Sequence, residues 1–348
     1  MHVPDGFINA PVSAATGVVA AGAVAVSLRG ARRELDERTA PLAGLVAAFI
    51  FAVQMLNFPV AAGTSGHLLG GALAAILVGP FTGVLCVSVV LLMQGILFAD
   101  GGLTALGVNI TDMAIVTTVV GYAVFRGLVK LLPRRRRSVT VASFVAALLS
   151  VPAAAVAFTL IYAVGGTTDV SLGKVATAMV GVHVLIGVGE AAITGLTVGA
   201  VIAVRPDLVY GARGLEQKLK LRVNGELVDA PSTRPAPVAA RTSRRALWVS
   251  GLVTSLVLAG FVSFYASSNP DGLEKVAHDK GIDSRARKHA SDGSPLAGYG
   301  VKDVEDARLS GGLAGVIGVG VTVVAGSTVF WAVRRRRTTD ASPVSTGV

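Results

Sequence analysis

The 348-residue sequence has few charged residues, few aromatic residues and a single cysteine. Charged residues make up 15% of the chain and hydrophobic residues 52%, whereas about a quarter of the residues in a typical soluble protein are charged. Together with a mean hydropathy of +0.67, this composition excludes an ordinary soluble protein and favours one that crosses a membrane several times. Because Cys86 is alone, the chain can form neither an intrachain disulfide nor a cysteine metal cluster.

The sequence also lacks the motifs of nucleotide binding. Gly173-Lys174 has neither the preceding glycine spacing nor the following Ser or Thr of a phosphate loop. Gly318 and Gly320 lie inside an apolar run, where small residues are more typical of helix packing than of a dinucleotide site. We therefore expect no ATP binding by this chain, no bound cofactor and no enzymatic activity.

Long apolar runs predict an all-α fold. A helix that crosses about 30 Å of hydrocarbon needs roughly 20 residues, and nine apolar runs of about this kind lie between charged or Gly/Pro-rich breaks. We expect a polytopic membrane helix bundle of about seven transmembrane helices, followed by a C-terminal two-helix module. The third run is short, and Gly79-Pro80 divides it from the fourth, so these two are predicted to form a tight helical hairpin. The runs are residues 10–28, 41–62, 65–80, 81–99, 108–129, 139–163, 175–204, 246–266 and 310–333.

Basic residues cluster after four of these runs and indicate the topology. If each run crosses the membrane once, all four clusters lie on one side, which the positive-inside rule identifies as the cytoplasm. The net charge of +10 is then a topology signal, so we expect the lipid bilayer and no nucleic acid as a partner. The predicted protein is a multi-pass plasma-membrane protein with an extracytoplasmic N-terminus and a cytoplasmic C-terminus. The clusters lie within residues 29–38, 126–137, 205–245 and 334–337.

The first two residues form a potential metal chelate. The amine of Met1, the backbone nitrogen of His2 and the ring of His2 can close a five-membered and then a six-membered ring around one ion. Nitrogen-only ligation suits Ni(II), Cu(II), cobalt and zinc, and it suits Mg and Ca poorly. The first residues lack the layout of a cleaved signal peptide, and the chelate requires that Met1 is retained. An ordinary frayed terminus is the alternative.

His67 is predicted to lie on the same side of the membrane as His2. It follows a loop that proline and glycine residues keep out of a helix, and it begins the third apolar run. Its ring could supply a fourth nitrogen, so that the site would need no carboxylate. A role in capping or lining a helix end is the competing interpretation.

Four further polar residues lie in or near apolar runs. His183 and Glu190 are two helical turns apart and share one face of the seventh run, without the HExxH spacing of a metalloprotease. They could be ligands, a proton-linked pair or structural hydrogen-bonding groups, and we favour the structural role. Asn109 and Asp112, at the start of the fifth run, either support the metal pocket or cap a helix.

Three segments resemble a known family. They are Met1-His2-Val3-Pro4-Asp5-Gly6-Phe7, the Gly66-His67 loop, and the stretch from His183 to Ala191. All three resemble the substrate-specific M component (CbiM/NikM family) of cobalt and nickel energy-coupling factor (ECF) transporters, over residues 1–210. The resemblance implies a seven-helix subunit whose N-terminal segment folds back into the bundle. It also implies a metal site made by the amine of Met1, the backbone and ring nitrogens of His2, and the ring of His67.

The C-terminal part is interpreted as a second module. Residues 211–245 have the composition of a basic cytoplasmic linker, residues 246–335 supply two helices with an extracytoplasmic loop between them, and residues 336–348 form a cytoplasmic tail. Pro270-Asp271-Gly272-Leu273-Glu274 resembles the motif of the PDGLE domain, found in the N-type accessory component or fused to the M component. His278, His289 and the acids of this loop could assist metal loading, but a solvated helix and turn is the favoured interpretation.

These observations predict a substrate-capture subunit for Ni²⁺ or Co²⁺, which is the transported substrate. Since the chain has no phosphate loop, the resemblance implies a Q-type transmembrane coupling subunit and O-type ATP-binding subunits as partners. Two alternatives stay open: a membrane-embedded metalloenzyme that uses His183 and Glu190, and a metal permease that needs no ATPase.

Overall fold

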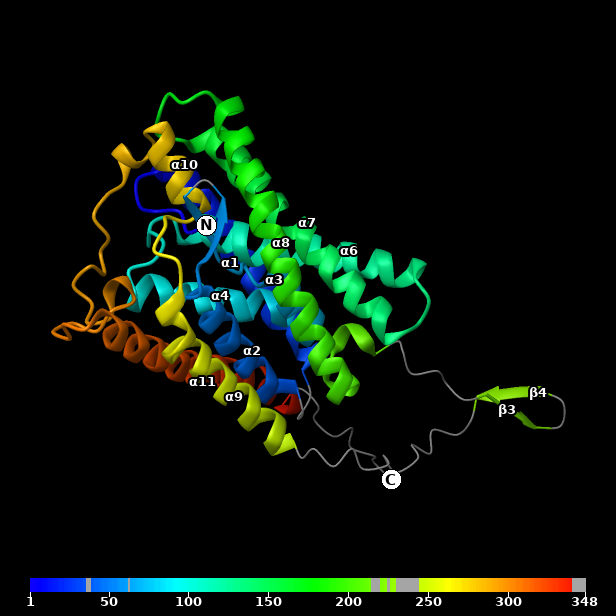
Figure 1. Cartoon of the computed structure of the whole chain (residues 1–348). Helices are drawn as coiled ribbons and strands as arrows, with labels where there is room; N and C mark the ends of the chain where they lie inside the picture. Colours follow the sequence, from blue (N-terminus) through cyan, green and yellow to red (C-terminus); the bar gives the residue numbers. More distant parts are fainter. Residues whose placement is uncertain (36–38, 62, 214–219, 224–225, 230–243, 340–348) are drawn as a thin grey trace.

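A computed structural model of the chain describes residues 1–35, 39–61, 63–213, 220–223, 226–229 and 244–339. The first part is a bundle of packed helices. The C-terminal helices α9 (Arg244–Gly260) and α11 (Ala307–Thr339) lie along it (Figure 1). The elements of the bundle are α1 Ala10–Glu34, α2 Thr39–Gln54, β1 Phe58–Ala61, β2 Thr64–Gly66, α3 Gly71–Val78, α4 Pro80–Leu97, α5 Leu106–Asn109, the π-helix η1 Ile110–Val116, α6 Thr117–Leu131, α7 Arg136–Gly165 and α8 Leu172–Val204.

The fold is the predicted all-α membrane bundle. Among the described residues, seven helices are long and apolar enough to cross a membrane, and α2 is a shorter apolar helix. The strands are confined to two small antiparallel hairpins, β1 with β2 and β3 (Lys220–Val223) with β4 (Glu226–Asp229). The protein is therefore a multi-pass membrane protein.

The third apolar run differs from its prediction as a helix. Residues 67–70 are not helical, Gly70 has the left-handed conformation with φ of 88°, and only the eight residues of α3 are helical. The segment reaches from Met1, beside His67, to Glu34, beside Gly79. The non-helical residues therefore cover the part of this distance that the short α3 does not.

Glu34 fixes the turn between α3 and α4. Its carboxylate accepts hydrogen bonds from the backbone N–H groups of Phe81 and Thr82, which are unpaired donors of the first turn of α4. Gly79, with φ of 105°, makes the reversal before Pro80. The predicted tight hairpin at Gly79-Pro80 is thus present, although its first arm is partly non-helical.

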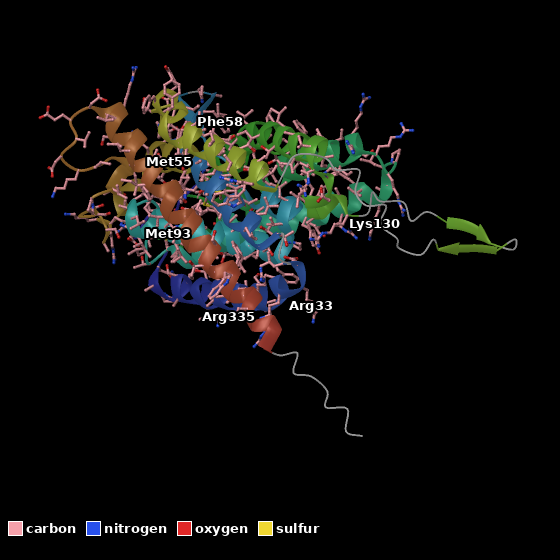
Figure 2. The ribbon with its side chains drawn as sticks, turned by 90° about the horizontal axis from the view of Figure 1, so that it is seen from below. Arg33, Met55, Phe58, Met93, Lys130 and Arg335 are labelled. Carbon is pink, nitrogen blue, oxygen red and sulfur yellow. The ribbon has the colours of Figure 1, made fainter. Side chains whose placement is uncertain are left out.

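The bundle has two chemically different ends. Met55, Phe58 and Met93 lie toward one end, and Arg33 and Lys130 lie toward the other (Figure 2). The N-terminus and α10 (Gly272–Lys280) are at the first end, whereas α6 meets α7 at the second (Figure 1). We call these the Met1 end and the basic end.

The C-terminal helices pack against the bundle through small residues. Helices α9 (Arg244–Gly260) and α11 (Ala307–Thr339) both contact α2. A Cβ at Gly251 would meet the side chain of Leu45 at 2.6 Å, and a Cβ at Gly318 would lie within 2.8 Å of the ring of Phe98. Glycine therefore lets the helices approach closely, as the composition predicts.

Parts of the predicted linker and tail fall outside the described residues. Residues 214–219, 224–225, 230–243 and 340–348 are not described, and the linker contributes the β3–β4 hairpin. Ahead of it, Gly211 and Ala212 are buried, and a Cβ at Gly211 would lie 2.6 Å from the ring of Phe125. The bundle thus continues two residues beyond position 210.

Candidate metal site

The N-terminal segment folds back into the bundle at the Met1 end. Helix α1 begins only after Asn9, whose side chain accepts a hydrogen bond from the N–H of Val12. Met1 is 2% exposed and His2 8%. The segment is held by backbone pairing, because the N–H of Asn9 donates to the carbonyl of Gly165 at 2.7 Å. This burial is the opposite of a frayed terminus.

Asn109 fixes the backbone directly after His2. Its Oδ1 accepts from the N–H of Val3 at 2.7 Å, and its Nδ2 donates to the Val3 carbonyl at 3.2 Å. Two residues later, Oδ1 of Asp5 accepts from the N–H of Thr104 at 2.8 Å. Asn109 therefore positions the N-terminal segment, and its side chain forms no cap hydrogen bond with η1.

His67 is held in place through the non-helical residues that follow it. Oε2 and Oε1 of Glu190 accept from the N–H groups of Leu69 and Gly70 at 2.7 and 3.0 Å. On the other side, Nε2 of Gln54 donates to the carbonyl of Leu69 at 3.0 Å. These contacts are of the kind that a structural role for Glu190 requires, because buried backbone groups outside a helix need other hydrogen-bond partners.

The predicted ligand atoms converge. The amine of Met1 lies 2.6 Å from Nε2 of His67, and the rings of His2 and His67 are stacked with centroids 5.2 Å apart. Nδ1 of His67 lies 2.9 Å from the carbonyl of Leu68. A carbonyl only accepts hydrogen bonds, so Nδ1 carries the proton and Nε2 presents its lone pair beside the amine.

His2 is held between two polar side chains. Its Nε2 lies 3.0 Å from Oε1 of Gln94. Its Nδ1, the ring nitrogen that closes the six-membered chelate ring with the His2 backbone nitrogen, lies 3.3 Å from Oδ1 of Asp100. Gln94 favours a proton on Nε2 and the Asp100 carboxylate favours one on Nδ1, so the two groups orient the ring without fixing one tautomer.

A carboxylate that the sequence interpretation did not assign to the site lies at its centre. Oδ2 of Asp271 is 2.5 Å from the amine of Met1 and 3.4 Å from Nε2 of His67. His2, His67 and Asp271 each present a ligand atom, and these atoms lie within 4.8 Å of one another. A carboxylate thus lies beside the predicted nitrogen donors, which the sequence interpretation did not anticipate. The Pro-Asp-Gly-Leu-Glu motif was visible, but nothing in the sequence placed it beside Met1.

Burial sets the protonation states of the site. Removal from water lowers the pKa of His2 to about 4, so that its ring is neutral near pH 7. Burial by itself would raise the pKa of Asp271, but the positive charge of the Met1 amine and the hydrogen bond that this amine donates hold it well below its usual value. Asp271 is therefore a carboxylate, and it balances the charge of the amine.

The other two predicted supporting residues are buried but do not join this cluster. Nδ1 of His183 bonds the carbonyl of Met179 at 2.7 Å, and its Nε2 has no hydrogen-bond partner among the described residues. The carboxylate oxygens of Asp112, in η1, likewise have no partner in the described part of the chain. Asp112 is therefore not a helix cap.

The loop between α9 and α11 is only in part the solvated helix and turn that we favoured, because one side of it packs on the bundle. Leu273, Val276 and Ala277 of α10 are buried. The N–H of Arg287 donates to the carbonyl of Asp5 at 2.8 Å, and Nε2 of His289 lies 3.1 Å from the carbonyl of Gly101. His278, in contrast, is exposed and bonded to Asp283. The loop covers the Met1 end because its apolar and backbone groups find partners there.

Comparison with known proteins identifies both parts of the chain. The family described as "Cobalt uptake substrate-specific transmembrane region" (CbiM) matches residues 2–208, and the PDGLE domain matches residues 245–335. The cobalt transport protein CbiM of Geobacter sulfurreducens is 32% identical over 299 residues, which cover 82% of this chain and 80% of that protein. The fused nickel transport protein NikMN of Rhodobacter capsulatus is 42% identical over 125 residues, 36% of each chain.

A solved structure supports the same assignment. The crystal structure of a truncated transition metal transporter is 27% identical, with a TM-score of 0.53, and the match covers 58% of this chain and 99% of that one. These relatives are metal transport proteins, so the metalloenzyme alternative based on His183 and Glu190 is wrong. The chain belongs to the CbiM family of cobalt-uptake substrate-specific transmembrane proteins and carries a PDGLE domain on its C-terminal side.

Proposed function

We propose that this protein is the substrate-capture subunit of an ECF-type importer for Ni²⁺ or Co²⁺. The ion is bound by four nitrogens: the amine of Met1, the backbone nitrogen and Nδ1 of His2, and Nε2 of His67. The observation that carries the proposal is the 2.6 Å approach of the Met1 amine to Nε2 of His67. It supports the proposal because two donors at this separation can bind one ion side by side.

The chemistry of these donors favours late divalent metals. Imidazole, amine and backbone nitrogen suit nickel and cobalt, whereas Mg and Ca prefer oxygen ligands. To ligate the ion, the amine and the His2 amide must each lose a proton, so binding is expected to strengthen with rising pH. Gln94 supports the site by orienting the ring of His2, and the Leu68 carbonyl supports it as the acceptor that holds the proton on Nδ1 of His67.

The distribution of charge supports an orientation and a set of partners. Arg33 and Lys130 lie at the end opposite the metal site (Figure 2), and the positive-inside rule makes that end cytoplasmic. The metal site then lies on the extracytoplasmic side of the plasma membrane. A phosphate loop is absent from the sequence, so ATP hydrolysis falls to separate O-type subunits that act through a Q-type coupling subunit.

Metal uptake by whole cells tests this function. Cells that express the chain with its coupling and ATPase subunits are expected to accumulate nickel or cobalt, and His67→Ala or an inactive ATPase should abolish uptake. Exposed Asp283→Asn is the control and should leave uptake unchanged. Uptake that persists with the inactive ATPase would favour a permease instead.

A further inference from the structure

Asp271 comes from the second domain and reaches the metal site of the first. It lies within the PDGLE match of residues 245–335, whereas Met1, His2 and His67 belong to the bundle. Asp271 is 7% exposed, and its Oδ2 contacts both the amine of Met1 and Nε2 of His67. The two domains therefore share one buried cluster of polar atoms.

The two carboxylate oxygens of Asp271 have different partners. Oδ1 accepts the N–H of Glu274 at 2.9 Å, and the Glu274 side chain accepts the N–H of Asp271 at 2.9 Å. This capping box begins α10 and satisfies donors of its first turn. Oδ2 is not needed by the helix, and it faces the amine and the imidazole.

The surroundings hold Asp271 rigidly over the site. The carbonyl of Pro270 accepts from the N–H of Ser65 at 2.9 Å, and the carbonyl of Asn269 accepts from the Ser65 hydroxyl at 2.8 Å. A Cβ at Gly272 would meet the side chains of Ile186 and Val182 at 2.8 Å. The loop is thus tied to β2, the strand that directly precedes His67, and Gly272 lets it approach α8 closely.

The carboxylate of Asp271 balances the positive charge of the buried site. In the metal-free structure, the ammonium of Met1 and the carboxylate of Asp271 lie 2.5 Å apart and cancel. A bound divalent ion with a deprotonated His2 amide would leave one positive charge in a buried site, and Asp271 would cancel it. Asp100 also lies near His2, but its side chain is 26% exposed and water screens its charge. An uncompensated buried charge is costly.

We infer that Oδ2 of Asp271 is a fifth ligand of the transported ion, so that the metal site is completed only when the PDGLE domain is docked. This inference rests on the proposed four-nitrogen site and adds an oxygen donor to it. Before the ion arrives, the same oxygen pairs with the amine of Met1. When the amine loses its proton to bind the ion, the oxygen exchanges the ammonium for the metal.

Nickel spectroscopy on the full-length protein tests the fifth ligand without any mutation. Nickel(II) bound by four nitrogens in a plane gives a distinct 1s→4p feature in its X-ray absorption edge, and a fifth ligand suppresses this feature. We expect the wild-type protein to lack it. A wild-type edge with the full planar feature would overturn the inference.

The Asp271→Asn variant provides a second, quantitative test by calorimetry with Ni²⁺ and Co²⁺. Asparagine is as good an N-cap as aspartate, so α10 should stay docked while Oδ2 is lost. We expect affinity to fall by about 10- to 100-fold and the planar feature to appear with nickel. The control is Asp279→Asn, which removes an exposed carboxylate from the same helix and should change neither result.

The variants also separate this inference from the proposed function. If His67→Ala abolishes nickel binding while Asp271→Asn binds with wild-type affinity and an unchanged edge, the four-nitrogen site stands and Asp271 is only a counter-ion of the amine. If His67→Ala binds as well as wild type, the proposed function itself fails.

Discussion

The amine of Met1 lies 2.6 Å from Nε2 of His67, although 66 residues separate them in the chain. This approach depends on groups that are not ligands. Asn109 holds the backbone after His2, and Glu190 holds the backbone after His67. The site is therefore built from two non-helical segments that buried polar side chains fix in place.

Asn109→Ala should loosen the N-terminal segment. The N–H and carbonyl of Val3 would both lose their Asn109 partner, and each buried unsatisfied group costs about 1–3 kcal/mol. Metal affinity measured by calorimetry should fall at least about tenfold, since the segment must be docked to bind. Thr111→Val is the control, because its hydroxyl bonds only the carbonyl of Gly107 within its own helical segment. Equal affinity of Asn109→Ala and wild type would contradict this positioning role.

Gln94→Met should weaken metal binding without unfolding the bundle. The substitution removes the amide that lies 3.0 Å from Nε2 of His2, so the ring is held less firmly in the orientation that presents Nδ1. Loss of such a partner typically costs about 10- to 100-fold in metal affinity. Calorimetry gives the affinity, and thermal unfolding of the metal-free protein serves as the control. A Gln94→Met protein with wild-type nickel affinity would show that the ring of His2 is oriented in another way.

Glu190→Ala should reduce stability even when no metal is present. Two buried N–H groups would lose their acceptor, at a cost of about 1–3 kcal/mol each. Thr194→Val, one turn further along α8, removes a hydroxyl that has no hydrogen-bond partner among the described residues, so it should be neutral or stabilising. Thermal unfolding in detergent compares the two variants. A Glu190→Ala protein that unfolds like wild type but binds no nickel would instead indicate a ligand.

Acid should release the N-terminal segment from the metal-free protein. The pKa of His2 is about 4 when docked and near 6.5 when free. Above pH 6.5 both states are neutral, and docking is unaffected. As the pH falls from 6.5 toward 4, only the released segment takes up a proton, so docking weakens by about 2 kcal/mol at pH 5.

Hydrogen exchange of the Val3 amide, corrected for its intrinsic pH dependence, measures this release. Protection should fall between pH 6.5 and 5 in the wild-type protein. His2→Gln should lose this component of the pH dependence. Protection that stays constant in wild type across this range would show that His2 does not control docking.

The sequence was sufficient to predict that His2 and His67 lie at the same end of the bundle, but not that Asp271 lies beside them. His2 and His67 could be placed together because apolar runs and basic clusters indicate which end of the bundle each residue reaches. Asp271 is 270 residues from Met1, and its contact depends on how α10 packs on α8. Tertiary packing of this kind leaves no local pattern. The non-helical residues 67–70 were missed for a related reason, because the acceptor that replaces helical hydrogen bonding belongs to Glu190, on another helix.

The free amine of Met1 is the central claim, and calorimetry of an N-terminally extended protein tests it most directly. One additional residue before Met1 converts the amine into an amide while leaving every side chain in place, and the same residue added after Val348 is the control. Wild type and the C-terminally extended protein should bind Ni²⁺ or Co²⁺ equally, with protons released, and the N-terminally extended protein should show no binding. Undiminished binding by the N-terminally extended protein would contradict the proposed site.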